Sequence, residues 1–286
     1  MKKILPVFLL ALTAIAQAQT KTISQAIITT KTTTVSPEGE DDLPPPPQSV
    51  NGEEVRVMRF GGDGETKSVT TLKGAMVKTF SESEMGRTTV LRDNTNKKTT
   101  TLMEMMGNKT GFYVTDEEQE VMRKQMDSMM QTRRQGNDNN ALTGNAPKST
   151  EIIYVEESKK IAGQVCKKAF IVTIRQNGTK DSSTVWYCPD FKLEGIASTG
   201  GLSGFGNFGR TTSLGGLSDI AGFPMQYEMK LNRGRKMIVE VTKLVIDKEI
   251  ADKEFEIPKD FVVKPMKDMQ TGNGRGFQIR MGGPGN

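Results

Sequence analysis

The sequence predicts a mainly antiparallel β fold of the α+β class, with one amphipathic helix packed against the sheet. Three observations support this prediction. Short runs rich in β-branched residues alternate with turn residues from residue 67 onward. Two pairs of runs are joined by glycine-containing loops of hairpin length. One segment, 116–134, has apolar residues at helical spacing.

The first eighteen residues predict a Sec-type signal peptide. Met1-Lys2-Lys3 is basic, the run from Ile4 to Ala16 carries no charge, and Ala16-Gln17-Ala18 has the small-x-small pattern of a cleavage site. A membrane anchor would need about 20 apolar residues, and this run is shorter. We therefore expect cleavage near Ala18, a periplasmic or secreted mature protein, and no transmembrane segment in it.

Residues 19–66 are expected to contain a first strand and then a flexible segment. The run from Ile23 to Val35 is rich in β-branched residues. Residues 36–52 include four consecutive prolines, Pro44 to Pro47, which favour an extended polyproline conformation. This proline run is either a solvated spacer or a ligand for a partner domain that recognises proline.

One antiparallel β domain is expected over residues 67–266. Its first strands form a meander, because the turns between them are too short to hold the helices that parallel strands require. The strands expected in this part are 69–81, 87–92, 98–106 and 109–115.

The predicted helix runs from Asp116 to Arg134. Thr115-Asp-Glu-Glu118 has the form of a capping box, and the acidic start and basic end suit the helix dipole. Its apolar face either packs as core against the sheet or covers an apolar ligand as a flexible lid, since methionine repacks readily. That face carries Val121, Met122, Met126, Met129 and Met130.

Two later hairpins have three-residue loops, 176–178 and 232–234. Each loop ends in a glycine suited to the left-handed conformation. The second loop sets the register of its strands, so that Tyr227 faces Val239. One face of this hairpin is then wholly apolar and consists of Met225, Tyr227, Met229, Met237, Val239 and Val241.

Two glycine-rich stretches interrupt or follow the domain. Residues 195–219 contain scattered Leu and Phe, and form either a mobile apolar flap over a site or a poorly ordered insertion. Residues 267–286 are expected to be a disordered tail.

The composition argues against several classes of function. The chain has no histidine, which removes Ser-His-Asp and Cys-His catalysis and His-ligated zinc. Without Lys2 and Lys3, 37 basic residues face 34 acidic ones, an excess too small and too evenly spread to indicate nucleic-acid binding. No phosphate-binding or calcium-binding loop is recognisable. We therefore expect a non-catalytic protein with no cofactor and no metal.

The two cysteines, Cys166 and Cys188, are expected to form a disulfide. Pairing Arg175 with Thr179 across the first hairpin loop sets the cysteines directly opposite one another. Opposed residues of antiparallel strands have Cα atoms roughly 4.5–5.5 Å apart, within the range that a disulfide accepts.

Four short motifs occur in order along the domain. They are Ile161-Ala-Gly-Gln-Val-Cys-Lys-Lys-Ala169, Val185-Trp-Tyr187, Gly222-Phe-Pro224 and Phe255-Glu-Ile-Pro258. With these motifs the chain resembles the GLPGLI-related exported domains of unknown function from Gram-negative bacteria over roughly residues 67–266. The chain departs from that pattern where Met225-Gln-Tyr227 replaces a second Gly-Leu-Ile.

The resemblance implies a fold distantly similar to the LolA/LolB-like lipoprotein carriers, a curved half-barrel sheet with helices against its concave side. It carries over no catalytic residues. Our leading hypothesis is a non-catalytic domain that binds or carries an apolar or lipid-like ligand. The alternative is an envelope protein–protein interaction module without a small-molecule ligand. The expected ligand-binding residues are Met122, Met126, Met129, Met130, Tyr227 and Met229.

We expect protease to cut residues 36–52 and 270–286 first, because neither stretch has periodic apolar residues that could anchor it. Limited proteolysis followed by mass spectrometry checks this. Removal of 270–286 should leave the melting temperature nearly unchanged, and a large fall would show that the tail is docked.

Overall fold

The computed structural model describes residues 20–37, 48–50, 53–55, 64–83, 86–135, 147–194, 216–231, 234–246 and 248–270. The predicted signal peptide, the proline run, most of the glycine-rich insertion and the end of the tail lie outside these residues. No helix in the described part of the chain is both long and apolar enough to span a bilayer.

Strands dominate the described chain. The first half comprises β1 (Lys21–Ile23), β2 (Gln25–Val35), β3 (Gln48–Val50), β4 (Glu53–Val55), β5 (Gly64–Lys73), β6 (Met76–Ser83), β7 (Gly86–Asp93), β8 (Lys98–Met105), β9 (Asn108–Thr115) and the helix α1 (Asp116–Gln135). The second half comprises β10 (Pro147–Ile161), β11 (Gln164–Arg175), β12 (Lys180–Cys188), β13 (Phe191–Leu193), β14 (Phe223–Lys230), β15 (Lys236–Ile246), β16 (Val263–Pro265), the helix α2 (Met266–Gln270) and the 3₁₀ turns η2 (Leu217–Asp219) and η4 (Asp252–Phe255).

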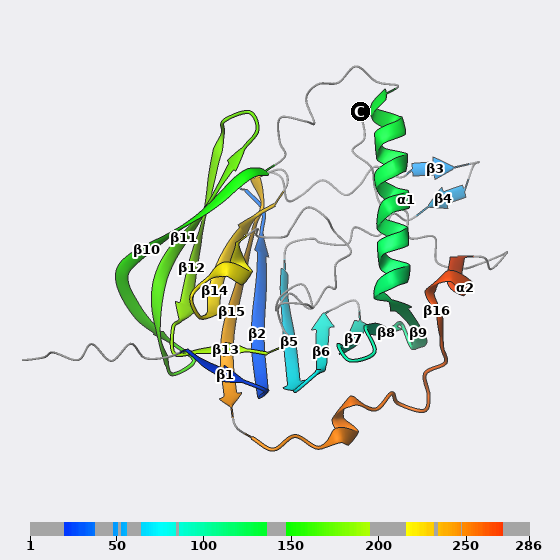
Figure 1. The fold of residues 1–286 in the computed structure, drawn as a ribbon. Coiled ribbons are helices and arrows are strands. Elements are labelled where there is room, and N and C mark those ends of the chain that lie inside the picture. Colours follow the sequence, from blue (N-terminus) through cyan, green and yellow to red (C-terminus); the bar gives the residue numbers. More distant parts are fainter. Residues whose placement is uncertain are drawn as a thin grey trace, which may run out of the picture.

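Twelve strands form one sheet, in the order β10-β11-β12-β14-β15-β2-β5-β6-β7-β8-β9-β16 (Figure 1). Neighbours are antiparallel except β9 and β16, which run parallel. The sheet is open, with β10 and β16 at its edges. The predicted mainly antiparallel β fold is therefore confirmed.

The first long strand, β2, lies in the middle of this sheet. It pairs with β5 on one side and with β15 on the other, although β15 follows it by some two hundred residues in the sequence. In Figure 1 the blue β2 stands beside the orange β15. Strand β2 therefore joins an early meander, β5 to β9, to a late one, β10 to β15.

Both predicted hairpin registers are confirmed. In β14 and β15, Tyr227 faces Val239, and the backbone amide of Leu231 donates to the carbonyl of Arg235 at 2.8 Å. In β11 and β12, the amide of Arg175 donates to the carbonyl of Thr179 at 2.9 Å. Turn chemistry and apolar alternation agree at both hairpins, so they determine the register together.

Two parts of the strand prediction were wrong. The expected strand 69–81 is a hairpin, because the chain reverses at Gly74, whose φ of 54° suits glycine. Strand β10 was not predicted at all. Its second half contains Glu156, Glu157, Lys159 and Lys160, residue types that are uncommon in strands.

The main core covers one face of the sheet. Alternate residues of the central strands point to this face, and Ile28, Leu72, Val185 and Val239 are completely or almost completely buried there. A smaller cluster lies on the opposite face of β7 and β8, where Leu91 and Leu102 meet Ile250 and Phe255 of the C-terminal chain. Both faces of the early meander therefore carry apolar contacts.

The predicted capping box of α1 is confirmed. The amide of Glu118 donates to Thr115 Oγ1, and the amide of Thr115 donates to Glu118 Oε2, both at 3.2 Å. A buried guanidinium adds a second anchor. Arg92 of β7 donates through Nη1 and Nη2 to the two carboxylate oxygens of Asp116, at 2.5 and 2.8 Å. The start of the helix is thus fixed to the sheet.

The apolar face of α1 differs from the expected core packing where the structure describes it. The side chain of Val121 is 54% exposed, and Met122 is half-buried. The side chains of Met126, Met129 and Met130 lie outside the described residues. The helix is attached through its first turn at the end of β9, and Val121, one turn further on, is largely exposed.

We predict that Asp116→Asn lowers the free energy of unfolding by about 1–3 kcal/mol near neutral pH, because Arg92 loses its carboxylate partner in a largely buried position. Arg92 holds the pKa of Asp116 below its usual value. The ion pair therefore stabilises the folded state fully at pH values above the pKa that Asp116 has in the unfolded chain. This stabilisation is lost as the pH falls through the lower pKa that Asp116 has in the folded state.

Chemical denaturation of wild type and variant at several pH values measures this difference, which should shrink in acid. Lys124→Gln is the control, since it removes only the exposed pair with Glu120 and should have little effect. Equal losses in the two variants would contradict an anchoring role for Arg92 and Asp116.

Candidate functional site

The candidate site is a groove between the sheet and a C-terminal strap, which we define as residues 250–263. The strap crosses the face of β5 to β9 that is opposite to the main core (Figure 1). Phe255 is buried against this face, and Phe261 is half-buried there. The strap then pairs with β9 through β16, so its two ends are fixed and its middle spans the sheet.

Lysines of the sheet hold the first part of the strap. Lys73 Nζ lies 2.5 Å from the carboxylate of Asp252, and Lys78 Nζ donates to the backbone carbonyl of Glu254 at 2.8 Å. Further along, the strap passes close to Gly111 of β9. A Cβ at that position would lie 2.8 Å from Val263 Cγ2, so only glycine allows this approach.

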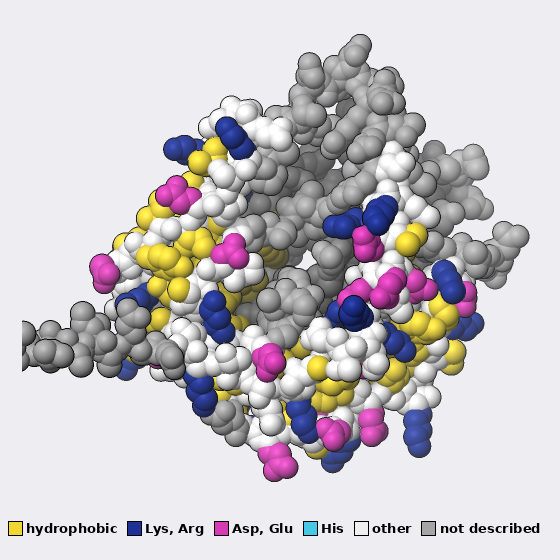
Figure 2. All heavy atoms as spheres, in the orientation of Figure 1, with side chains coloured by type: hydrophobic (Ala, Val, Ile, Leu, Met, Phe, Trp, Pro, Cys, Tyr) yellow, Lys and Arg dark blue, Asp and Glu magenta, His cyan; other side chains and the backbone are white. Residues whose placement is uncertain are grey.

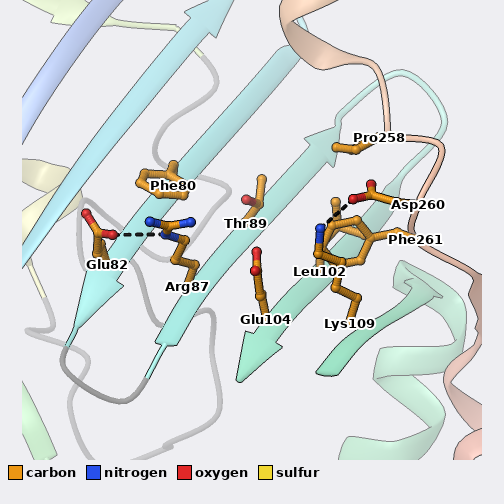
Figure 3. Close-up of a pocket in the computed structure, with 10 residues that line it drawn as sticks. All are labelled: Phe80, Glu82, Arg87, Thr89, Leu102, Glu104, Lys109, Pro258, Asp260 and Phe261. Carbon is orange, nitrogen blue, oxygen red and sulfur yellow. Dashed lines mark hydrogen bonds and ion pairs between the residues drawn. The ribbon is translucent and has the colours of Figure 1, made fainter. Parts of the chain in front are cut away.

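Two adjoining cavities of about 350 Å³ each lie under the strap. They share a floor and wall made of Phe80, Thr89, Leu102, Pro258 and Phe261. Figure 3 shows that Phe261 of the strap lies over Leu102 of β8, with Pro258 beside them. The inner part of the groove is thus mainly apolar.

The rim of the groove is a ladder of alternating charges across four strands. Each charged residue lies directly opposite the next one on the neighbouring strand, from β6 to β9: Glu82, Arg87, Glu104 and Lys109. Arg87 Nε donates to Glu82 Oε1 at 2.9 Å, and Lys109 Nζ lies 2.5 Å from Asp260 of the strap (Figure 3). The register of the meander places all of these side chains on one face.

Each resolved pKa shift in this ladder favours the charged form. The hydrogen bond with Glu82 raises the pKa of Arg87. The hydrogen bond between Lys109 and Asp260 raises the pKa of the amine and lowers that of the carboxyl. Arg87, Lys109 and Asp260 are therefore charged at neutral pH. Such a rim holds fixed charges around an apolar floor, an arrangement suited to binding an amphipathic molecule.

Of the six predicted ligand-binding residues, the three whose side chains the structure describes, Met122, Tyr227 and Met229, do not line these cavities. Tyr227 is 3% exposed and packs with Met229 in the main core, on the opposite face of the sheet. Met122 is half-buried on α1, and the side chains of Met126, Met129 and Met130 are outside the described residues. The structure therefore places Tyr227 and Met229 in one cluster, and Met122 is not part of that cluster.

The sequence contained a partial signal for the charged rim. Glu82 and Arg87 lie on either side of the predicted turn before strand 87–92, and Glu104 and Lys109 on either side of the turn before strand 109–115, so hairpin pairing sets each pair side by side. The strap could not be found in this way. Its position depends on long-range contacts of Phe255 and Phe261, which local periodicity does not encode.

The predicted disulfide is absent, because Cys166 and Cys188 are both buried free thiols. Their strands have the predicted register, but pairing ends with Lys167 opposite Tyr187, one residue short of the cysteines. The pairing of β12 with β14 is also irregular between Trp186 and Tyr187. The Cys166 thiol instead lies 3.6 Å from the carbonyl oxygen of Gln164, to which it donates.

Within the described ranges, no cluster of three or more carboxylate or thiol side chains could hold a metal ion.

No protein-family model matches the sequence, and no curated protein matches it. The chain has weak similarity to two crystal forms of PNGF-II, with TM-scores of 0.35 and 0.34 and identities of 14% and 13%. The matches cover 86% of this chain but only 32% and 33% of those structures.

These likenesses are too weak to support an argument about fold or function. The resemblance to the GLPGLI-related domains, and the curvature that it implies, therefore stay predictions.

We predict that both cysteines of the native protein resist alkylation. Burial raises the pKa of Cys166 to about 11 and also raises that of Cys188. At pH 8 the thiolate fraction of Cys166 should be roughly two hundredfold below that of an exposed cysteine. Iodoacetamide labelling with and without denaturant measures this difference, and failure to label in denaturant without a reductant would reveal a disulfide.

Alkaline pH should also destabilise the protein. Because the folded pKa of Cys166 lies above the unfolded one, the unfolded state loses its thiol protons first. The contribution of this thiol to the free energy of unfolding is complete below about pH 8.5 and is lost as the pH rises to about 11. A Cys166→Ala variant, which has no such proton to lose, is the control.

Proposed function

We propose that this chain is an exported, non-catalytic β-domain that binds or carries an apolar or lipid-like ligand, and that the ligand occupies the groove under the C-terminal strap. The observation that supports this most directly is the apolar floor of two adjoining cavities beneath a fixed charged rim. Small-molecule sites in proteins commonly combine such a floor with a few orienting polar groups.

The two parts of the groove suit the two parts of an amphipathic molecule. An alkyl chain would contact Phe80, Leu102 and Phe261, with each Å² of apolar surface buried contributing about 25 cal/mol. An anionic head group would lie by Arg87 and Lys109, whose charged forms are further favoured by their carboxylate partners, which raise the pKa of both groups. A neutral polar head group would be accepted by the same rim through hydrogen bonds.

The proposal retains two expectations from the sequence. The signal peptide would deliver the protein to the periplasm or the medium, where lipid-like molecules must be shielded from water in transit. A half-barrel curvature of the sheet, as in the LolA/LolB-like carriers, would add a second apolar surface on the side of α1. The methionine face of that helix then becomes the competing location for the ligand.

We predict that Thr89→Trp weakens ligand binding, because Thr89 lines both cavities and an indole there would fill much of the groove. Affinity for a fluorescent fatty acid should fall at least about tenfold, a change of 1.4 kcal/mol. Thr184→Trp is the matched control, since it adds the same bulk at a half-buried strand position outside the groove.

Melting temperatures of both variants show whether either one is misfolded. A wild-type protein that binds no fatty acid or phospholipid, and that carries none in native mass spectrometry, would refute the proposed function. If Thr89→Trp binds normally while Met126→Gln with Met129→Gln does not, the ligand lies at the helix and the groove assignment is wrong.

A further inference from the structure

The two edge strands of the twelve-stranded sheet differ in how well they are protected against pairing with a further strand. Strand β16 is three residues long, contains Pro265 and continues directly into α2. A short edge with a proline cannot accept another strand. Strand β10 at the other edge is fifteen residues long, and among the strands that the structure describes it pairs with β11 alone. It presents the outward-pointing N–H and C=O groups of a long strand.

The middle of β10 has few of the features that usually block an edge. Its pairing with β11 is irregular next to Lys148 and again across Glu156 and Glu157. Between these irregularities, residues 149–155 pair regularly and contain one charge and no proline or glycine. Ile153 and Tyr154 are 44% and 47% exposed. Figure 2 shows apolar side chains gathered over this flank of the molecule.

We propose that residues 148–156 of β10 pair antiparallel with the same residues of a second copy of this chain, about a two-fold axis at Ile152. The two sheets become continuous through this seam. The interface is isologous, so it closes after two copies and does not propagate into a fibre.

Symmetry restricts the register. In a continuous antiparallel sheet the two-fold axis stands normal to the sheet and leaves each copy's core face on the same side. Directly opposed residues share a face, and faces alternate along a strand. A residue can therefore oppose only a residue of like parity, so the axis must lie midway between the two copies of one residue.

The sequence of β10 selects that residue. Ile152 is the centre of the regular run 149–155, so only an axis there pairs the whole run with itself. Lys148 of one copy then lies beside Glu156 of the other, twice in the dimer. An axis at Glu151 would set this carboxylate against itself. An axis at Tyr154 would oppose Glu151 with Glu157.

The size of the seam indicates a weak dimer. Nine residues from each copy form it, which is fewer than the 20–30 residues a side of a standard stable interface. Self-association should therefore depend on concentration in the full mature chain. It should also depend on the charges at the two ends of the seam.

A charge swap tests both the interface and its register. Lys148→Glu or Glu156→Lys alone brings like charges together and should weaken dimerisation roughly tenfold in sedimentation equilibrium. The double variant restores opposite charges and should recover the wild-type constant. Lys160→Glu, an exposed change on the same strand beyond the irregularity, is the control and should behave as wild type.

Hydrogen exchange gives an independent readout. Amides of residues 149–155 should become protected as the protein concentration rises. A wild-type chain that stays monomeric at the highest attainable concentration would overturn the proposal, and so would a dimer that is indifferent to the charge swap. Protection that appears only when a different protein is added would assign the edge to a foreign strand and equally overturn self-pairing.

Discussion

The backbone hydrogen bonds on the two sides of β2 are the constraint on which the rest of the structure depends. One side joins it to β5 and the early meander, and the other joins it to β15 and the late one. Ala26 and Ile28 are completely buried, so the register of β2 also decides which face of both meanders becomes the main core. A shift of one residue would turn these side chains to the opposite face. The pairing of β2 on both sides thus joins the two meanders into one sheet, and the alternation of its side chains gives them a common core face.

The groove is a consequence of the same alternation. Once Leu72 and Val77 point to the main core, their neighbours Thr71 and Lys78 must point to the opposite face. That face carries too little apolar surface to form a second full layer, and the strap covers only part of it. The uncovered part is a groove whose floor comes from alternate strand positions and whose rim comes from the ends of the same strands. Fixed charges and apolar surface therefore meet along one line.

Prediction from the sequence was correct for those features of the fold that interactions between nearby residues determine. The capping box at Thr115, both hairpin registers and the strand expected over 23–35 were correct, since turn chemistry and apolar alternation act over a few residues. Strand β10 was missed because its partner supplies the pairing that its charged second half does not favour. The strap needed tertiary contacts of Phe255. Cys166 and Cys188 were correctly set near one another, but register alone does not give the local geometry that a disulfide bond requires.

The central position of β2 also governs the order in which the sheet can assemble. During synthesis β2 emerges early and can pair with β5, which is the next long strand of the sheet. Its other side stays open until β15 follows, near the end of the chain. Contacts so distant in sequence slow folding, because the intervening loop must close before the pairing stabilises it. The early meander can form while the late one is still being made, and the seam between β2 and β15 then closes late, before only the strap and β16 are added. A chain built in this way cannot complete its largest sheet until almost all of it has been synthesised, so an edge of β2 stays exposed for most of that time.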